Sequence, residues 1–360
     1  MTQSFRSPLS FRSSLAGIPA YAAGKPAPQI PGLTSFKLSS NEVPFGPLPQ
    51  AVEAAHAALV AGQLYPDAGA AALRLAIGGF HGLPEDQVLV GSGAVGVLYE
   101  LLTALCEADD EVVYAWRSFE AYPIAVQLTG ASSVRVPLTA EAGHDLPAMA
   151  AAITPATKAV IICTPNNPTG VSLSHDEIAD FLTQVPDTVA VILDEAYHEF
   201  DDSPDRVRAV ELLELHPNLV ALRTFSKAYG LAGLRIGYGL ARAEVVAEVG
   251  KAHLPFSASS AAQAAAIASL EHSDAGLARL RPVLAERARL VALLAESNIE
   301  VPSTSANFVW LETGERTDEI AEALSADGIT ARPFAGEGIR VSVGTAEATD
   351  RVVGALLQVW

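Results

Sequence analysis

The stretch Thr224–Arg235 reads TFSKAYGLAGLR and follows an apolar run over residues 219–223. It places Lys227 among hydroxyls, small residues and an arginine. A lysine that attacks a carbonyl needs partial desolvation and a nearby cation, because both lower the pKa of its amine. Hydroxyls and a guanidinium are also groups that bind phosphate. Since a solvated lysine in a Gly-rich turn fits the same pattern, the interpretation depends on residues upstream.

The apolar run at 219–223 is one of a series. From about residue 50 to 240, short runs rich in Val and Ile alternate with Ala- and Leu-rich stretches, which is typical of βαβ units. The predicted strands are 87–90, 111–115, 133–137, 158–163, 189–193 and 219–223. Ser174 and Glu177 form a capping-box pattern that predicts a helix after the fourth strand. Because several runs are almost wholly apolar, we expect a doubly wound, mostly parallel α/β domain.

The pattern of apolar residues changes after Pro255. Long helices are predicted at 261–272 and 275–297, strands at 307–311 and 339–343, and a final helix near 346–359. This pattern predicts a smaller α+β domain. We expect an N-terminal arm over 1–29 that packs with the small domain or a partner subunit, a large domain over 30–243, and a small domain over 244–360.

Composition narrows the classes of function. The chain has 360 residues, 41 of them acidic and 23 basic, so its net charge of -18 repels phosphate backbones and anionic lipid. We expect neither nucleic acid nor membrane as a partner. Cys106 and Cys163 alone provide no disulfide framework and no metal site, which fits the cytoplasm. Residues 1–40 lack acids, as transit peptides do, but their prolines favour an extended arm.

Four polar motifs follow predicted strands. In an open parallel sheet, ligands bind beyond the carboxyl ends of the strands, so we expect these motifs to converge. They are GSGAVG at 91–96, TPNNPTG at 164–170, DEAY at 194–197 and the Lys227 stretch. The first also matches the dinucleotide fingerprint, which would favour a nicotinamide oxidoreductase. Under either interpretation, glycines at a helix N-terminus indicate a phosphate.

Asp194 ends a predicted buried strand, where an unpaired carboxylate is costly. A protonated pyridine nitrogen would serve as its partner and would be kept charged as an electron sink. An N-cap or a salt bridge to a core arginine is the alternative role for Asp194. Tyr197 and Asn167 can hydrogen-bond a ring hydroxyl, and the alternatives are a packed core tyrosine and a turn asparagine.

Together these motifs resemble those of fold-type I pyridoxal-phosphate aminotransferases, in the histidinol-phosphate and aromatic amino-acid branch, and most closely the actinobacterial-type aromatic enzymes. The resemblance covers essentially the whole chain. It runs through SNE at 40–42, YPD at 65–67, NNPTG at 166–170, DEAY at 194–197, TFSKAYGLAGLRIGY at 224–238, ANF at 306–308 and IRV at 339–341.

The resemblance implies the cofactor, pyridoxal 5'-phosphate, and its ligands. Lys227 would form the Schiff base and move the proton, Asp194 would pair with the pyridine nitrogen, and Tyr197 with Asn167 would hold the ring oxygen. Phe119 would stack on the ring where the family usually has a tyrosine. The phosphate would be bound by Gly93, Ala94, Val95, Thr224, Ser226, Arg235 and, from the second subunit of a homodimer, Tyr65.

The resemblance also implies an amino acid and a 2-oxo acid such as 2-oxoglutarate as substrates in a ping-pong reaction, with Arg340 gripping the substrate carboxylate. The other expected substrate-binding residues are Tyr21, Asn41, Tyr122, Phe256, Asn307 and Arg332. With histidinol phosphate, Arg340 would instead bind phosphate, helped by Arg332 and Tyr21. We favour an aromatic amino acid such as phenylalanine as the donor. Four aromatic residues could supply an apolar wall for its side chain: Phe119, Tyr122, Phe256 and Phe334. Glu337 would also repel a phosphate ester.

Three other classes stay open at this point. A nicotinamide oxidoreductase explains GSGAVG but gives no role to NNPTG, DEAY and SKAYG together. A pyridoxal-phosphate decarboxylase or lyase shares every cofactor residue. A cofactor-binding regulator without activity would be expected to carry a DNA-binding segment, and the chain is strongly acidic.

Overall fold

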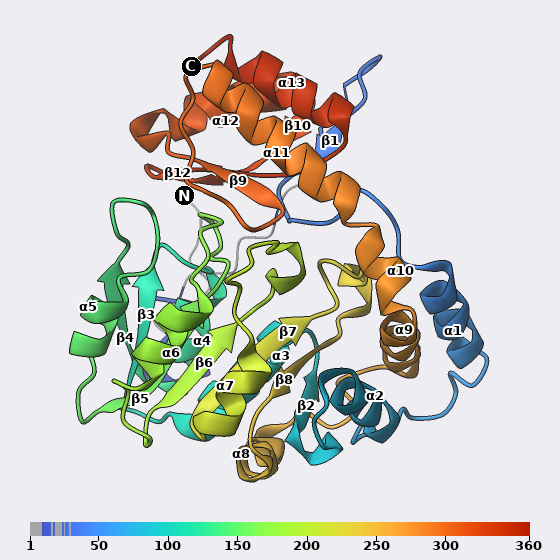
Figure 1. The fold of residues 1–360 in the computed structure, drawn as a ribbon, viewed down its shortest axis with the longest axis vertical. Coiled ribbons are helices and arrows are strands. Elements are labelled where there is room, and N and C mark those ends of the chain that lie inside the picture. The colour runs from blue at the N-terminus through green and yellow to red at the C-terminus, as the bar shows by residue number, and fades with distance from the viewer. Residues whose placement is uncertain (1–8, 16, 19–23, 25, 29) are drawn as a thin grey trace.

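The computed structural model describes residues 9–15, 17–18, 24, 26–28 and 30–360. Its larger part, here called the large lobe, is built on a seven-stranded sheet in the order β2–β8–β7–β6–β5–β3–β4 (Figure 1). The strands are β2 (Val88–Gly91), β3 (Glu111–Trp116), β4 (Ser132–Pro137), β5 (Thr157–Cys163), β6 (Ala190–Asp194), β7 (Leu219–Thr224) and β8 (Gly237–Leu240). The six predicted strands are therefore present, each within a residue or so of its predicted range.

All neighbours in this sheet are parallel except β8, which runs antiparallel to β2 and to β7. The prediction of a mostly parallel α/β sheet is confirmed. The sequence GYGL of β8 was not predicted as a strand, because glycine has a low strand propensity.

Helices cover both faces of the sheet, as the apolar runs predict. Along β5, Val160 belongs to one buried apolar cluster and its neighbour Ile161 to another, so successive side chains point to opposite faces. The helices that connect the strands are α3 (Ala94–Leu105), α4 (Ala121–Thr129), α5 (Leu146–Ala151), α6 (His175–Leu182) and α7 (Ala209–Leu215). The capping box of α6 is confirmed: Ser174 Oγ accepts from Glu177 N, and Glu177 Oε2 accepts from Ser174 N.

The small lobe is an antiparallel sheet in the order β11–β12–β9, with three helices on the face that points away from the large lobe (Figure 1). Its elements are α11 (Arg281–Glu296), β9 (Phe308–Leu311), α12 (Thr317–Ala326), β11 (Arg332–Phe334), β12 (Gly338–Ser342) and α13 (Ala346–Leu356). The prediction of a single helix over 275–297 is wrong. It is divided into α10 (Ser273–Ala278) and α11, because Pro282 in the first turn of α11 cannot continue a helix from before it.

Other elements join the two lobes. β1 (Phe36–Lys37) pairs in parallel with β10 (Ile329–Thr330), beside the small lobe. α8 (Ala243–Val249) and α9 (Ser260–Glu271) lie beside the large sheet, where α9 packs on α1 (Pro49–Leu59) and α2 (Ala71–His81) (Figure 1). From the expected arm, the carbonyl of Pro26 accepts a hydrogen bond from Thr330 Oγ1 at 3.0 Å.

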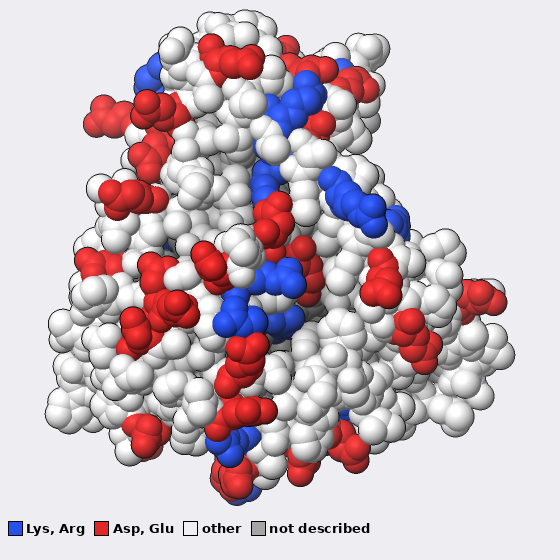
Figure 2. Space-filling model, viewed as in Figure 1, with Lys and Arg blue, Asp and Glu red and all other residues white. Residues whose placement is uncertain are grey.

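The surface carries charges of both signs. On the face shown in Figure 2, acidic side chains are scattered over the outline, while basic ones lie mainly in a central band where acidic ones are mixed with them. Within the described residues, no helix is long and apolar enough to cross a membrane.

Candidate active site

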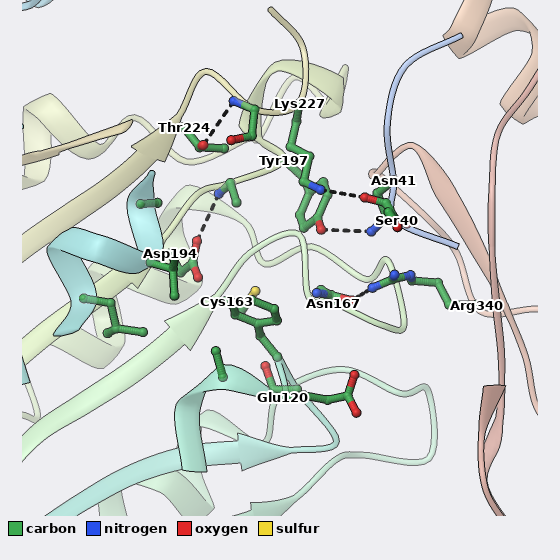
Figure 3. Close-up of a pocket in the computed structure, with 18 of the residues that line it drawn as sticks. Ser40, Asn41, Glu120, Cys163, Asn167, Asp194, Tyr197, Thr224, Lys227 and Arg340 are labelled. Carbon is green, nitrogen blue, oxygen red and sulfur yellow. Dashed lines mark hydrogen bonds between the residues drawn. The ribbon is translucent and has the colours of Figure 1, made fainter. Parts of the chain in front are cut away.

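A cavity of about 440 Å³ lies between the lobes, at the carboxyl ends of β5, β6 and β7. Each of the four predicted motifs contributes to it: Ala94 and Val95, Asn167, Asp194 with Tyr197, and Lys227. Figure 3 shows Asn167, Asp194 and Lys227 around one space, each from the end of a separate strand. The predicted convergence is therefore observed in the structure.

Lys227 follows β7 and is half-buried at the cavity. Its Nζ donates a hydrogen bond to the carbonyl of Ser40 at 2.8 Å (Figure 3) and lies 5.7 Å from the centroid of the Tyr197 ring. Burial, and after it the charge of Arg340, lowers the pKa of Lys227 to about 7. A large share of this amine is thus neutral near pH 7, which is the form that attacks a carbonyl.

Asp194 is the last residue of β6 and is 6% exposed. Its Oδ2 accepts from the Tyr122 hydroxyl at 2.6 Å, and its Oδ1 accepts from the Ala196 N–H at 3.2 Å. Burial raises the pKa of Asp194, and these hydrogen bonds act in the opposite direction. A carboxylate in this position stabilises a cation in the cavity.

Tyr122 therefore differs from the expectation that it contacts substrate. It is fully buried in the apolar cluster of α3 and α4, and it is absent from the residues that line the cavity. The reason is its place in the first turn of α4, which points the ring into the sheet and its hydroxyl at Asp194. Tyr122 is a positioning residue for that carboxylate.

Tyr197 and Asn41 form a hydrogen-bonded pair at the cavity wall. The Asn41 Nδ2 donates to the Tyr197 hydroxyl at 2.9 Å (Figure 3). Asn41 is itself held by Ser342 of β12, whose Oγ donates to Asn41 Oδ1 at 2.9 Å. Asn307 donates to the Asn41 carbonyl at 3.1 Å and lies behind it, outside the cavity lining.

The N-terminus of α3 provides a site for an anion. Gly93 has a φ of 78°, and a Cβ there would lie 2.7 Å from Arg235 Nη2. Arg235 Nη1 donates to Ser226 Oγ at 3.2 Å, and the Ser226 N–H donates to Thr224 Oγ1 at 3.1 Å. Backbone N–H groups at the start of α3, a guanidinium and two hydroxyls thus lie together beside Gly93.

Two arginines enter the cavity from the small lobe. Arg340 of β12 is buried and donates to Asn167 Oδ1 and to the carbonyl of Ser39 (Figure 3). Arg332 of β11 donates to Glu120 Oε2 at 2.6 Å. Phe119 and Phe334 add apolar surface to the lining.

Other expected site residues lie elsewhere. Tyr65 is 84% exposed, and its ring centroid is 4.9 Å from that of Phe256, with neither residue among those that line the cavity. Tyr21 falls outside the described residues. The sequence interpretation missed the carbonyl of Ser40, the carboxylate of Glu120 and Cys163, whose pKa burial raises to about 12. Within the described part of the chain, no three His, Cys, Asp or Glu residues gather in a way that could hold a metal.

Comparison with known proteins gives a consistent result. A sequence model of the "Aminotransferase class I and II" family matches residues 34–356. The chain is 48% identical over 339 residues to the aromatic amino acid aminotransferase of Streptomyces avermitilis, covering 94% of each chain. It is 47% identical over 345 residues to that of Thermobifida fusca, covering 96% of each.

Among solved structures, the chain is similar to histidinol-phosphate aminotransferase from Sinorhizobium meliloti, crystallised in complex with pyridoxal-5'-phosphate. The TM-score is 0.84 at 29% identity, covering 89% of this chain and 90% of that chain. Family match, full-length relatives and the strand-end site agree, and the chain belongs to the class I and II aminotransferase family.

Proposed function

We propose that this protein is a pyridoxal-phosphate-dependent aminotransferase that moves the amino group of an aromatic L-amino acid to a 2-oxo acid such as 2-oxoglutarate. The observation that carries the proposal is that one cavity is lined both by a half-buried lysine whose pKa is lowered to about 7 and by a buried carboxylate at the end of the neighbouring strand. Relatives named aromatic amino acid aminotransferases, at 44 to 48% identity, support the substrate class.

The residues present fit the cofactor. Asp194 can pair with a ring nitrogen, Tyr197 and Asn167 can hold a ring oxygen, and Phe119 can cover a ring face. The phosphate fits the cradle at Gly93, where a side chain would collide with Arg235. When bound, pyridoxal 5'-phosphate supplies an aldehyde that takes up the amino group and a protonated ring that stores the electrons of the Cα bond.

The chain's own residues then orient substrate and move protons. Lys227 Nζ would hold the cofactor's aldehyde carbon and, when free, would move the Cα proton of the substrate. Arg340, which the small lobe contributes, binds the substrate carboxylate through two parallel hydrogen bonds. Asp194, whose Oδ2 accepts a hydrogen bond from Tyr122, would pair with the positive ring nitrogen.

Replacing Lys227 tests the reaction class. Lys227→Ala is expected to lose the visible absorption band of the bound cofactor and transamination between phenylalanine and 2-oxoglutarate. Lys251→Ala, an exposed lysine paired with Glu248, is the matched control and keeps both. Normal turnover by the Lys227 variant contradicts the proposal, and release of CO2 or pyruvate from the donor would indicate a decarboxylase or lyase.

Histidinol phosphate is the second candidate donor, because the Sinorhizobium meliloti structure bears that name and Arg332 with Arg340 could serve a phosphate. The measurement is kcat/KM for phenylalanine and for histidinol phosphate with one acceptor. We expect phenylalanine to be preferred. A preference for histidinol phosphate would reassign the enzyme.

For the assembly, we propose a homodimer in the cytoplasm, with Tyr65 reaching the phosphate site of the partner subunit. The exposed aromatic pair of Tyr65 and Phe256 supports an interface, and the two free, buried cysteines suit a reducing compartment. We propose a division into an arm over 1–29, a cofactor-binding domain over 30–243 and a C-terminal domain over 244–360, with β1, α8 and α9 joining the last two.

A further inference from the structure

Two of the ion pairs that cross between the lobes carry their charges in opposite directions. Arg332 of the small lobe pairs with Glu120 of the large lobe, with Nη2 2.6 Å from Oε2. Arg117 of the large lobe pairs with Glu337 of the small lobe, with Nε 2.7 Å from Oε2. The residues of each pair are more than two hundred positions apart in the chain.

Only one of these pairs borders the cavity. Glu120 and Arg332 both line it, and their side chains are 30% and 12% exposed. Arg117 and Glu337 are absent from the lining. Figure 3 places Glu120 at the start of α4, on the opposite side of the cavity from Lys227. A substrate whose amine is at Lys227 would therefore have Glu120 on the side of the cavity away from that amine.

The wall beside this pair is aromatic. Phe334 lines the cavity, its ring centroid is 5.3 Å from that of Trp310, and the Arg332 guanidinium carbon is 5.6 Å from the Phe334 ring. Arg332 therefore lies against a ring and a carboxylate at once. In this position its charge is already offset by Glu120 before any substrate enters.

We propose that Glu120 is a specificity-determining residue: by pairing with Arg332 it competes with a second anionic group for that guanidinium, and so favours aromatic side chains over anionic ones. This rests on the proposed function. An anion at the distal end would have to displace a charge-assisted hydrogen bond in a half-buried site, whereas an aromatic ring packs on Phe334 and leaves the pair intact.

The test uses two unreactive carboxylates that differ at the distal end. Glutarate carries a second carboxylate, and 3-phenylpropionate carries a phenyl ring. Their dissociation constants on the cofactor-loaded enzyme are measured by calorimetry for the wild type and three variants. The ratio of the two constants reports distal charge selection, because the first carboxylate is common to both.

In Glu120→Gln, the ratio is expected to shift about tenfold toward glutarate, the size of one charge-assisted hydrogen bond. In Glu120→Gln with Arg332→Gln, which replaces the pair by a neutral one, the ratio returns to within about threefold of the wild type. Glu337→Gln is the matched control: it breaks the inter-lobe pair of Arg117 and Glu337, which does not line the cavity, and its ratio stays near that of the wild type.

Two results overturn the proposal. An equal shift in Glu337→Gln would show that loosening the lobes, and not the charge of Arg332, changes the ratio. A tenfold loss of glutarate in the double variant would show that Arg332 binds the dicarboxylate despite Glu120. This second comparison holds even if the single Glu120 variant does not fold. Failure of the proposed function is recognised separately from these results, because the wild-type enzyme would then not transaminate phenylalanine at all.

Discussion

The hydroxyl of Tyr122 donates a hydrogen bond to Asp194 Oδ2 across 2.6 Å, and both residues are buried. Tyr122 lies on α4 after β3, and Asp194 lies at the end of β6, so a residue from one crossover helix supports the carboxylate of a strand two positions away in the sheet. The bond favours the ionised form of Asp194, against the burial that raises its pKa. The hydrogen bond thus limits the rise in the pKa of Asp194 that burial causes.

Removing this hydroxyl is expected to weaken cofactor binding. Tyr122→Phe keeps the ring but takes away the donor, so the pKa of Asp194 rises further and its pairing with a cationic ring weakens. We expect the dissociation constant of pyridoxal 5'-phosphate to increase about tenfold, the value of one hydrogen bond to a charged group. Equilibrium titration of the apoprotein, followed by absorbance, measures it.

Tyr114→Phe is the control for that experiment. Tyr114 is equally buried and its ring centroid is 5.9 Å from that of Tyr122, but its hydroxyl accepts from Arg135. Its loss is expected to leave cofactor affinity within about twofold. An equal effect of both substitutions would mean that packing, and not the bond to Asp194, matters.

Lys227 is expected to destabilise the apoprotein in a pH-dependent way. Burial, followed by Arg340, lowers its folded-state pKa from 10.5 to about 7. Below pH 7 the folded protein must bury a charged amine, and this cost falls as pH rises from 7 to 10.5, where the unfolded lysine also loses its proton. Lys227→Met, which cannot be charged, is therefore expected to raise the Tm of the apoprotein by several degrees at pH 7 and by less at pH 10.

Thermal unfolding of both apoproteins at the two pH values checks this. Lys251→Met, at an exposed position, should shift the Tm little at either pH. A gain for Lys227→Met that is equal at pH 7 and pH 10 would contradict the lowered pKa.

Glu195 and Arg223 form a buried ion pair directly behind the site, with Nε 3.0 Å from Oε2. Burial by itself raises the pKa of Glu195, but the charges of Arg223 and His198 outweigh it and hold the pKa at about 2. Because the pKa of Glu195 in the folded protein lies below the usual glutamate value of 4.5, the stabilisation by the pair is present above pH 4.5 and is lost as pH falls toward 2.

Glu195→Gln is accordingly expected to lower the free energy of unfolding by about 3 kcal/mol at pH 7, because it leaves a buried guanidinium without its carboxylate. Chemical denaturation measures the change. Combining Glu195→Gln with Arg223→Met should recover part of the lost free energy of unfolding, since the unpaired guanidinium is then removed too. Additive losses in the double variant would contradict a direct coupling between the two residues.

The central strands and the four polar motifs could be predicted because they depend on local pattern and on one rule of parallel sheets. Lys227, Asp194 and Asn167 each follow an apolar run, and such runs end at one edge. β8 escaped prediction because its Gly-rich sequence becomes a strand only by pairing with β2 and β7. The extended conformation of β8 therefore depends on its hydrogen bonds to these two strands, which are distant in sequence.

The supporting contacts could not be predicted, since their partners are distant in sequence. Tyr122 reaches a residue 72 positions away, and Glu120 one 212 positions away. Nothing in the local pattern around either residue distinguishes a substrate contact from a contact to another side chain. Tyr122 in particular looked like an apolar wall residue, and its role depends on how α4 packs on the sheet.

Tyr65 is expected to act in the partner subunit's site, and complementation between variants tests this. Tyr65 is 84% exposed and lies outside the lining of the cavity in its own chain. If it acts across the interface, a mixed dimer of Lys227→Ala and Tyr65→Ala chains places both substitutions in one site and leaves the other site intact. Mixing the two impaired homodimers under conditions that exchange chains should therefore restore activity. The Tyr65→Ala homodimer alone should show reduced cofactor affinity.

If Tyr65 acts within its own chain, each site of the mixed dimer keeps one substitution and no activity returns. A mixture that regains nothing, although chains have been shown to exchange by mass, would contradict the shared site.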